Sequence, residues 1–152
     1  MQALGVEAVG LERRQLGQAL LRRVDWIVQE TIAQTKETGE RVDDTVQARF
    51  ERVCRHSTPA VSRWIAGEGV AVTSDSARES SEVFGEIAAQ RWASVQEVMR
   101  RSFAWRNVMA TALRECAAQL GTPQKTLREA LSILQVTTET SLMRMGESFE
   151  KA

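Results

Sequence analysis

Apolar residues recur every three or four positions through most of this chain, and this feature excludes most folds that are not helical. Proline occurs only at Pro59 and Pro123, and the glycines gather at a few places between long periodic segments. A spacing of three to four residues is the period of an amphipathic α-helix, whereas a half-buried strand alternates every two residues. The run Val70-Ala71-Val72 is too short to be more than a loop or stub. The sequence therefore predicts an all-α fold.

The breaks between periodic segments divide the chain into about five long helices and a short one. Such a set of helices predicts a globin-like or bundle-like fold, because each helix has one apolar face to bury. The expected segments are, in order, Leu11 to Thr38, Val42 to His56, a short helix that starts at Ser57-Thr58-Pro59, a helix that follows capping residues at 73–76, a helix from an S-x-x-E capping box at Ser94 to Leu120, and a helix that starts at Thr122-Pro123.

The length of the chain and its balance of charges limit the kinds of molecule that it is expected to bind. The chain has 152 residues, which at roughly 150 residues per domain predicts a single helical domain over residues 1–152. Twenty basic residues balance twenty acidic ones, and this balance does not create the positive field that nucleic-acid binding needs. No stretch has the ~18 apolar residues of a membrane span, and the N-terminus lacks the features of a secretory signal. We therefore expect a cytoplasmic protein that binds neither nucleic acid nor membrane.

The inventory of reactive residues argues against catalysis and against a bound metal. One histidine, His56, and two cysteines, Cys54 and Cys116, cannot supply a closed four-ligand zinc site by themselves. The motifs of phosphate-binding loops, dinucleotide sites and zinc proteases are absent. We expect no enzyme activity and no cofactor; the alternative for His56 is a haem ligand, beside the simpler interpretation of a residue at a helix end. The cysteines are expected to be small buried hydrophobes.

Aromatic residues and one arginine form the candidate ligand pocket. Arginines and aromatics alternate between Arg91 and Arg106, a pattern that suits binding of an anion or a flat ring. The alternative is a core helix whose arginines pair with Glu86 and Glu97. The candidate pocket residues are Trp64, Phe84, Trp92, Phe103 and Trp105, with Arg106 as the polar anchor.

The last segment, residues 123–152, carries an apolar stripe that is typical of an interface. Its positions are spaced 4-3-4-4-3-4, a pattern that repeats every eleven residues and suits a nearly straight helix. No stop signal precedes Ala152, so we expect a C-terminal signalling helix that mediates a homodimer and passes on a shift of packing. The candidate dimer or signalling face consists of Leu127, Leu131, Leu134, Leu142, Met145 and Phe149.

Two stretches of the chain resemble known regulatory domains. Ser94 to Arg106, SVQEVMRRSFAWR, is similar to the central helix of the N-terminal sensor-like domains of RsbR-type stressosome proteins and PucR-type regulators. Phe84 to Arg106, together with Leu127 to Phe149, resembles the N-terminal regulatory region that precedes GGDEF diguanylate cyclase domains in actinobacteria. The matched positions of the first stretch are Phe103, Trp105 and Arg106.

This resemblance implies a globin-like helical fold without haem, dimerisation, and a last helix that continues as a signalling linker. The chain itself contains no GGDEF, STAS or helix-turn-helix output domain. We therefore expect a regulatory input module that signals to a fused or partner output domain, such as a diguanylate cyclase. The alternative function is a small-molecule or haem-binding sensor domain with an aromatic-lined pocket.

Overall fold

The computed structural model of this chain describes residues 10–36, 39–68 and 70–152, with the backbone alone described for residues 70–75. This part of the chain contains helices and no strand, so the predicted all-α, bundle-like fold is confirmed. The helices are α2 (Leu11–Leu21), α3 (Val24–Lys36), α4 (Asp44–Ile65), α5 (Val70–Gln90), α6 (Val95–Leu120) and α7 (Gln124–Lys151).

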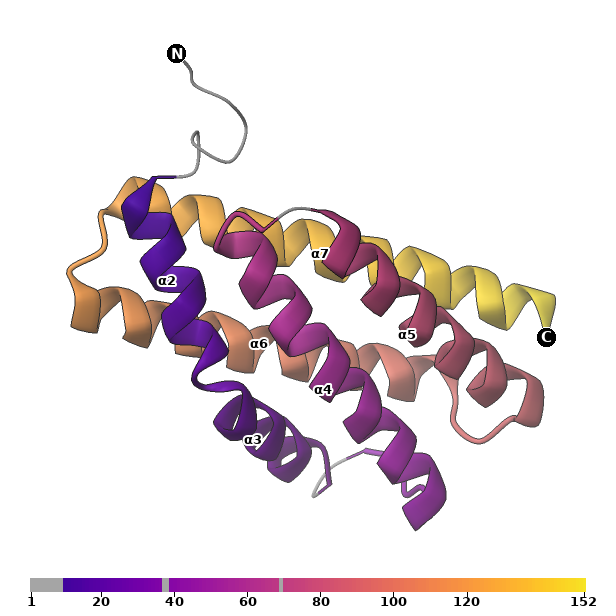
Figure 1. Cartoon of the computed structure of the whole chain (residues 1–152). Helices are drawn as coiled ribbons and strands as arrows, with labels where there is room; N and C mark the ends of the chain where they lie inside the picture. Colours follow the sequence, from indigo (N-terminus) through magenta and orange to yellow (C-terminus); the bar gives the residue numbers. More distant parts are fainter. Residues whose placement is uncertain (1–9, 37–38, 69) are drawn as a thin grey trace.

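Five helices form a closed ring. In the ring, α3 packs against α4, α4 against α5, α5 against α7, α7 against α6, and α6 against α3 again. The two longest helices, α6 and α7, lie side by side, and α4 crosses in front of them (Figure 1). Helix α2 packs against α4, α6 and α7 near one end of the ring. Across the ring, α4 also packs against α7, whereas α4 and α6 meet through side chains such as Thr58 and Trp105.

The prediction of one continuous helix from Leu11 to Thr38 is wrong, because the structure has two helices there, α2 and α3. The chain turns at Arg22, and the backbone N–H of Arg23 donates to the carbonyl of Leu20 at 2.9 Å, so that α2 and α3 point in different directions (Figure 1). A straight helix could not both lie across the end of the ring and fill the place between α4 and α6. Tertiary packing thus overrides a continuous apolar stripe. The expected end at Thr38 lies outside the described residues.

The predicted restart at Ser57-Thr58-Pro59 is also wrong, because α4 continues through Pro59 as a single helix. Proline has no N–H to donate, so the helix loses one backbone hydrogen bond there. The buried stripe continues on both sides of the proline, from Val46 and Phe50 to Val61 and Ile65. Burial of this stripe on two turns beyond the proline outweighs the lost bond.

The remaining helix boundaries agree more closely with the sequence. Helix α5 begins at Val70, so residues 70–72 are helical and the expected caps at 73–76 lie inside the helix; polar residues there cost only tenths of a kcal/mol each. The start of α6 is confirmed, since the Glu97 N–H donates to the Ser94 hydroxyl at 3.1 Å. Its end is confirmed by Gly121, whose φ of 69° is left-handed.

Two separate clusters of buried apolar side chains hold the bundle together. The first joins α2, α3, α4, α6 and α7 around Leu16, Met109 and Leu113. The second joins α4, α5, α6 and α7 around Phe50 and Ile87. Among the described helices, none is long and apolar enough to cross a membrane.

Candidate ligand-binding cavity

A cavity of about 250 Å³ occupies the interior of the helical ring, and all five ring helices line it. For comparison, an apolar cavity of about 150 Å³ holds a benzene molecule. Most of the lining surface is apolar. Along α4 the lining extends from Gln47 to Trp64, which at 1.5 Å per residue is about 25 Å of helix. The cavity therefore suits an elongated apolar molecule.

Three of the six predicted pocket residues line this cavity, namely Trp64, Phe84 and Trp105. They come from α4, α5 and α6, so the fold brings together residues that are far apart in sequence. The indole Nε1 of Trp105 donates to the Thr58 hydroxyl at 2.9 Å. This bond satisfies the buried indole N–H and fixes the orientation of the ring.

The other three predicted residues do not line the cavity. Trp92 lies between α5 and α6, where the Arg49 guanidinium stacks on its ring at 4.8 Å. The Arg106 guanidinium similarly lies 4.9 Å from the ring centre of Phe103. On α6 the cavity face is formed by positions 98, 101, 102 and 105, and helical geometry turns positions 103 and 106 away from that face. Arg106 is thus not the anchor of this cavity.

Among the described residues, two arginines line the cavity, Arg101 on α6 and Arg144 on α7, and sequence reasoning missed both as site residues. Of the two, Arg101 is the buried one. Its spacing from Val98 and Trp105, three residues and four residues, places it on the same face of α6. That spacing is the signal that could have found it. Only 6% of the Arg101 surface is exposed, which is unusual for a charged side chain and requires compensation.

Glu97 supplies the compensating charge for Arg101. Its Oε2 accepts hydrogen bonds at 2.6 Å from Nε of Arg101 and at 2.6 Å from Nη2 of Arg100. Its Oε1 accepts from the backbone N–H of Glu40 at 3.0 Å. Burial alone would raise the pKa of the Glu97 carboxyl, but the bonds from Arg100, Glu40 and Arg101 lower that pKa from 4.5 to about 2.

The same cluster ties the segment between α3 and α4 to the start of α6. The Glu40 carboxylate accepts the Ser94 backbone N–H at 3.0 Å and its hydroxyl at 2.6 Å. Glu40 therefore takes the place that Glu97 has in a regular capping box. Because its carboxylate is released from capping, Glu97 is available to bind the two arginines.

Two polar groups on the cavity wall have unused donors. Arg101 donates from Nη1 to Oε1 of Gln47 at 2.8 Å and stacks on Phe50 at 4.3 Å, but its Nη2 donates to no described residue. The amide Nε2 of Gln47 is buried and likewise has no hydrogen-bond partner. A buried donor without an acceptor costs about 1–3 kcal/mol.

Several threonines of the cavity wall donate their hydroxyl hydrogen bonds within their own helices. Thr31, Thr35 and Thr138 each donate to the carbonyl four residues earlier, at distances of 2.8 to 3.0 Å. These bonds remove the hydroxyls' need for water and leave methyl groups available to the cavity. Of the two buried side-chain nitrogens that have no hydrogen-bond partner among the described residues, Nε2 of Gln47 belongs to the cavity wall and Nε of Arg49 does not.

The remaining reactive side chains lie in different surroundings. The His56 side chain is half exposed on α4, 3.1 Å from a Glu79 carboxylate oxygen, and it does not line the cavity. Cys54 does line the cavity, and burial raises the pKa of its thiol to about 12. Cys116 is buried in the first apolar cluster. Within the described residues, no group of three or more metal-binding side chains occurs.

The predicted dimer face of α7 packs inside its own bundle. Leu134 and Met145 are buried, one in each apolar cluster. The other four residues are partly buried against the same two clusters, Leu127 and Leu131 against the first and Leu142 and Phe149 against the second. The periodic stripe therefore marks contact with α4, α5 and α6, and its regular spacing does not distinguish this contact from one between two chains.

No protein-family model, curated protein or solved structure matches this chain in the three comparisons.

Proposed function

We propose that this chain is a small-molecule sensor domain whose ligand occupies the cavity inside the helical ring. The single observation that carries this proposal is a cavity of about 250 Å³ lined by all five ring helices. Small-molecule sites are usually concave, mostly apolar spaces between packed elements, with a few polar groups, and this cavity has that character. The resemblance of residues 94–106 to sensor-like domains adds support.

Helix α7 is the element through which we expect ligand binding to be transmitted. It contributes Thr137, Thr138, Ser141 and Arg144 to the cavity wall and packs against both apolar clusters. A molecule that fills the cavity therefore contacts α7 directly. Binding would favour the position of α7 that fits the ligand, which is the differential contact that a signal requires.

The experiment uses N-phenyl-1-naphthylamine, a neutral dye that fluoresces in apolar surroundings. We expect saturable binding to the full chain. The Ala77→Phe variant narrows the cavity, since Ala77 lines it, and should weaken binding at least tenfold. Ala104→Phe is the matched control, because Ala104 is also half-buried but does not line the cavity. Equal binding by wild type and Ala77→Phe, with both folded by circular dichroism, would refute the cavity as the site.

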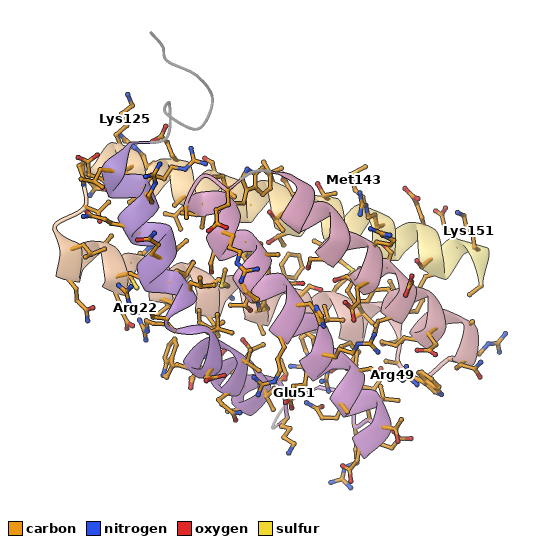
Figure 2. All side chains as sticks on the ribbon, in the orientation of Figure 1. Arg22, Arg49, Glu51, Lys125, Met143 and Lys151 are labelled. Carbon is orange, nitrogen blue, oxygen red and sulfur yellow. The ribbon has the colours of Figure 1, made fainter. Side chains whose placement is uncertain are left out.

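The second candidate is a regulatory module that dimerises through α7. The inner stripe of this helix is used within the bundle, but Met143 is 69% exposed on the outer side of α7 (Figure 2). Met143→Glu is therefore the appropriate test variant, because a charge at the buried Leu134 would unfold the chain. A dimer by native mass spectrometry that Met143→Glu converts to a monomer would favour this candidate.

A further inference from the structure

We infer that the ligand of this cavity is a carboxylate with an unbranched apolar tail, and that its head group binds Arg101 and Gln47. This inference rests on the proposed function, since it names the class of molecule that the same cavity would take. The charged groups and unused hydrogen-bond donors of the cavity wall specify the head group, which the volume and the apolar lining alone do not.

The charge of the wall favours an anion. Arg101 and Arg144 line the cavity, and no acidic residue is among the described lining residues. Glu97, whose carboxylate binds Nε of Arg101 at 2.6 Å, is not among the described lining residues. The cationic member of this pair therefore borders the cavity, which favours a negatively charged head group over a positively charged one.

The unused hydrogen bonds favour an acceptor with two oxygens. Nη2 of Arg101 donates to no described residue, and Nε2 of Gln47 is buried without a partner. These are N–H donors on neighbouring side chains, since Gln47 Oε1 already accepts from Nη1 of the same arginine at 2.8 Å. A carboxylate is an acceptor with no proton to donate, and a planar guanidinium is the side chain that suits it best.

The rest of the wall favours a chain-like tail. Most of the lining surface is apolar, and the hydroxyls of Thr31 and Thr138 bond to carbonyls of their own helices. The cavity passes between the two apolar clusters, with Phe84 and Trp105 on its wall. A polar end and a long apolar remainder together describe an amphipathic acid.

The test compares octanoate with octanamide at pH 7.5 by isothermal titration calorimetry. The two molecules have nearly the same shape, but only octanoate is charged. We expect octanoate to bind at least about tenfold more tightly, the effect of one charge-assisted hydrogen bond. Arg101→Met should bring the two affinities within about threefold of each other. Arg106→Met, the same change on the same helix outside the cavity, should preserve the preference.

Each outcome separates this inference from the proposed function. Equal binding of octanoate and octanamide by the wild type would overturn the carboxylate assignment and leave the cavity as a neutral apolar site. Tighter binding of octyl phosphate than of octanoate would replace the carboxylate with a phosphate head group. Failure of all three molecules to bind, with dye binding that Ala77→Phe weakens, would overturn this inference and leave the proposed function in place. Failure of the dye to bind as well would overturn both. Since Glu97 keeps Arg100 as a partner, Arg101→Met is expected to fold. If this variant does not fold, the difference in affinity between octanoate and octanamide for the wild-type chain still tests the carboxylate assignment.

Discussion

Replacing Glu97 with glutamine should destabilise this protein at neutral pH, and the cost should disappear in acid. The substitution keeps the shape of the side chain and one acceptor oxygen but removes the charge that compensates two arginines. A fall of the carboxyl pKa from 4.5 in the unfolded chain to about 2 in the folded one corresponds to about 3 kcal/mol at 1.36 kcal/mol per pKa unit. That is a large part of the 5–15 kcal/mol that stabilises a typical domain.

The sign of the pH dependence follows from the lowered pKa. The folded state holds the charged carboxylate more tightly than the unfolded state does, so the contribution is complete above about pH 4.5 and is lost as the pH falls toward 2. A protonated Glu97 resembles glutamine. The free energies of unfolding of wild type and Glu97→Gln should therefore differ by about 3 kcal/mol at pH 7 and converge near pH 2.

Urea unfolding monitored by tryptophan fluorescence measures this difference. With an m-value of about 2 kcal/mol/M, the midpoint at pH 7 should fall by roughly 1.5 M. Glu115→Gln is the control, because Glu115 pairs with Arg23 at 2.6 Å on the surface and is half exposed; its loss should cost less than about 1 kcal/mol. A loss below about 1 kcal/mol for Glu97→Gln, or a difference that stays constant between pH 7 and 3, would refute the reasoning.

Three further predictions test how the interior of the bundle is packed. Thr58→Val removes the acceptor of a buried indole N–H and should lower the free energy of unfolding by about 1–3 kcal/mol in urea; an unchanged value would mean that the bond is replaceable. Gly17→Ala places a Cβ 2.5 Å from the backbone nitrogen of Ala66 and should lower the free energy of unfolding by about 1–3 kcal/mol. Gly146 has open space around it, so Gly146→Ala should leave the free energy of unfolding unchanged or raise it by up to about 1 kcal/mol. Similar midpoints for the two alanine variants would contradict the close approach. With a thiol pKa near 12 in place of 9.0, Cys54 in the folded chain should react with iodoacetamide at pH 8 roughly 1000-fold more slowly than in urea, as peptide mass mapping would show.

Helical periodicity was sufficient to predict the class of fold and most helix ends, because those depend on neighbouring residues. The Ser94 cap and the Gly121 stop are local signals, and both are confirmed. The turn at Arg22 and the continuity of α4 through Pro59 depend on where other helices lie. A single sequence shows which face of a helix is apolar but not what covers that face, and this limit also explains the α7 stripe.

The candidate site was predictable only as a set of residue types. Of the predicted residues, Trp64, Phe84 and Trp105 line the cavity, whereas Trp92, Phe103 and Arg106 do not. The predicted arginine, Arg106, lies five residues beyond Arg101 on α6. The sequence pattern does not show which face of this helix borders the cavity. Gln47 could not be found at all, since its importance lies in an amide nitrogen left without a partner by the folded structure.

The position of the Glu97–Arg101 pair supports the proposed binding role more than its contribution to stability does. Replacing a buried ion pair with apolar side chains is often neutral or stabilising, so such a pair is weak evidence of a need for stability. Here the pair lies on the wall of a cavity, shares its carboxylate with Arg100, and has an unused donor beside another on Gln47. A chain that needed only a stable bundle could fill this space with leucine. An arginine with an unused donor beside an apolar cavity suits recognition of a small anion, and this supports the proposed binding role over a purely structural one.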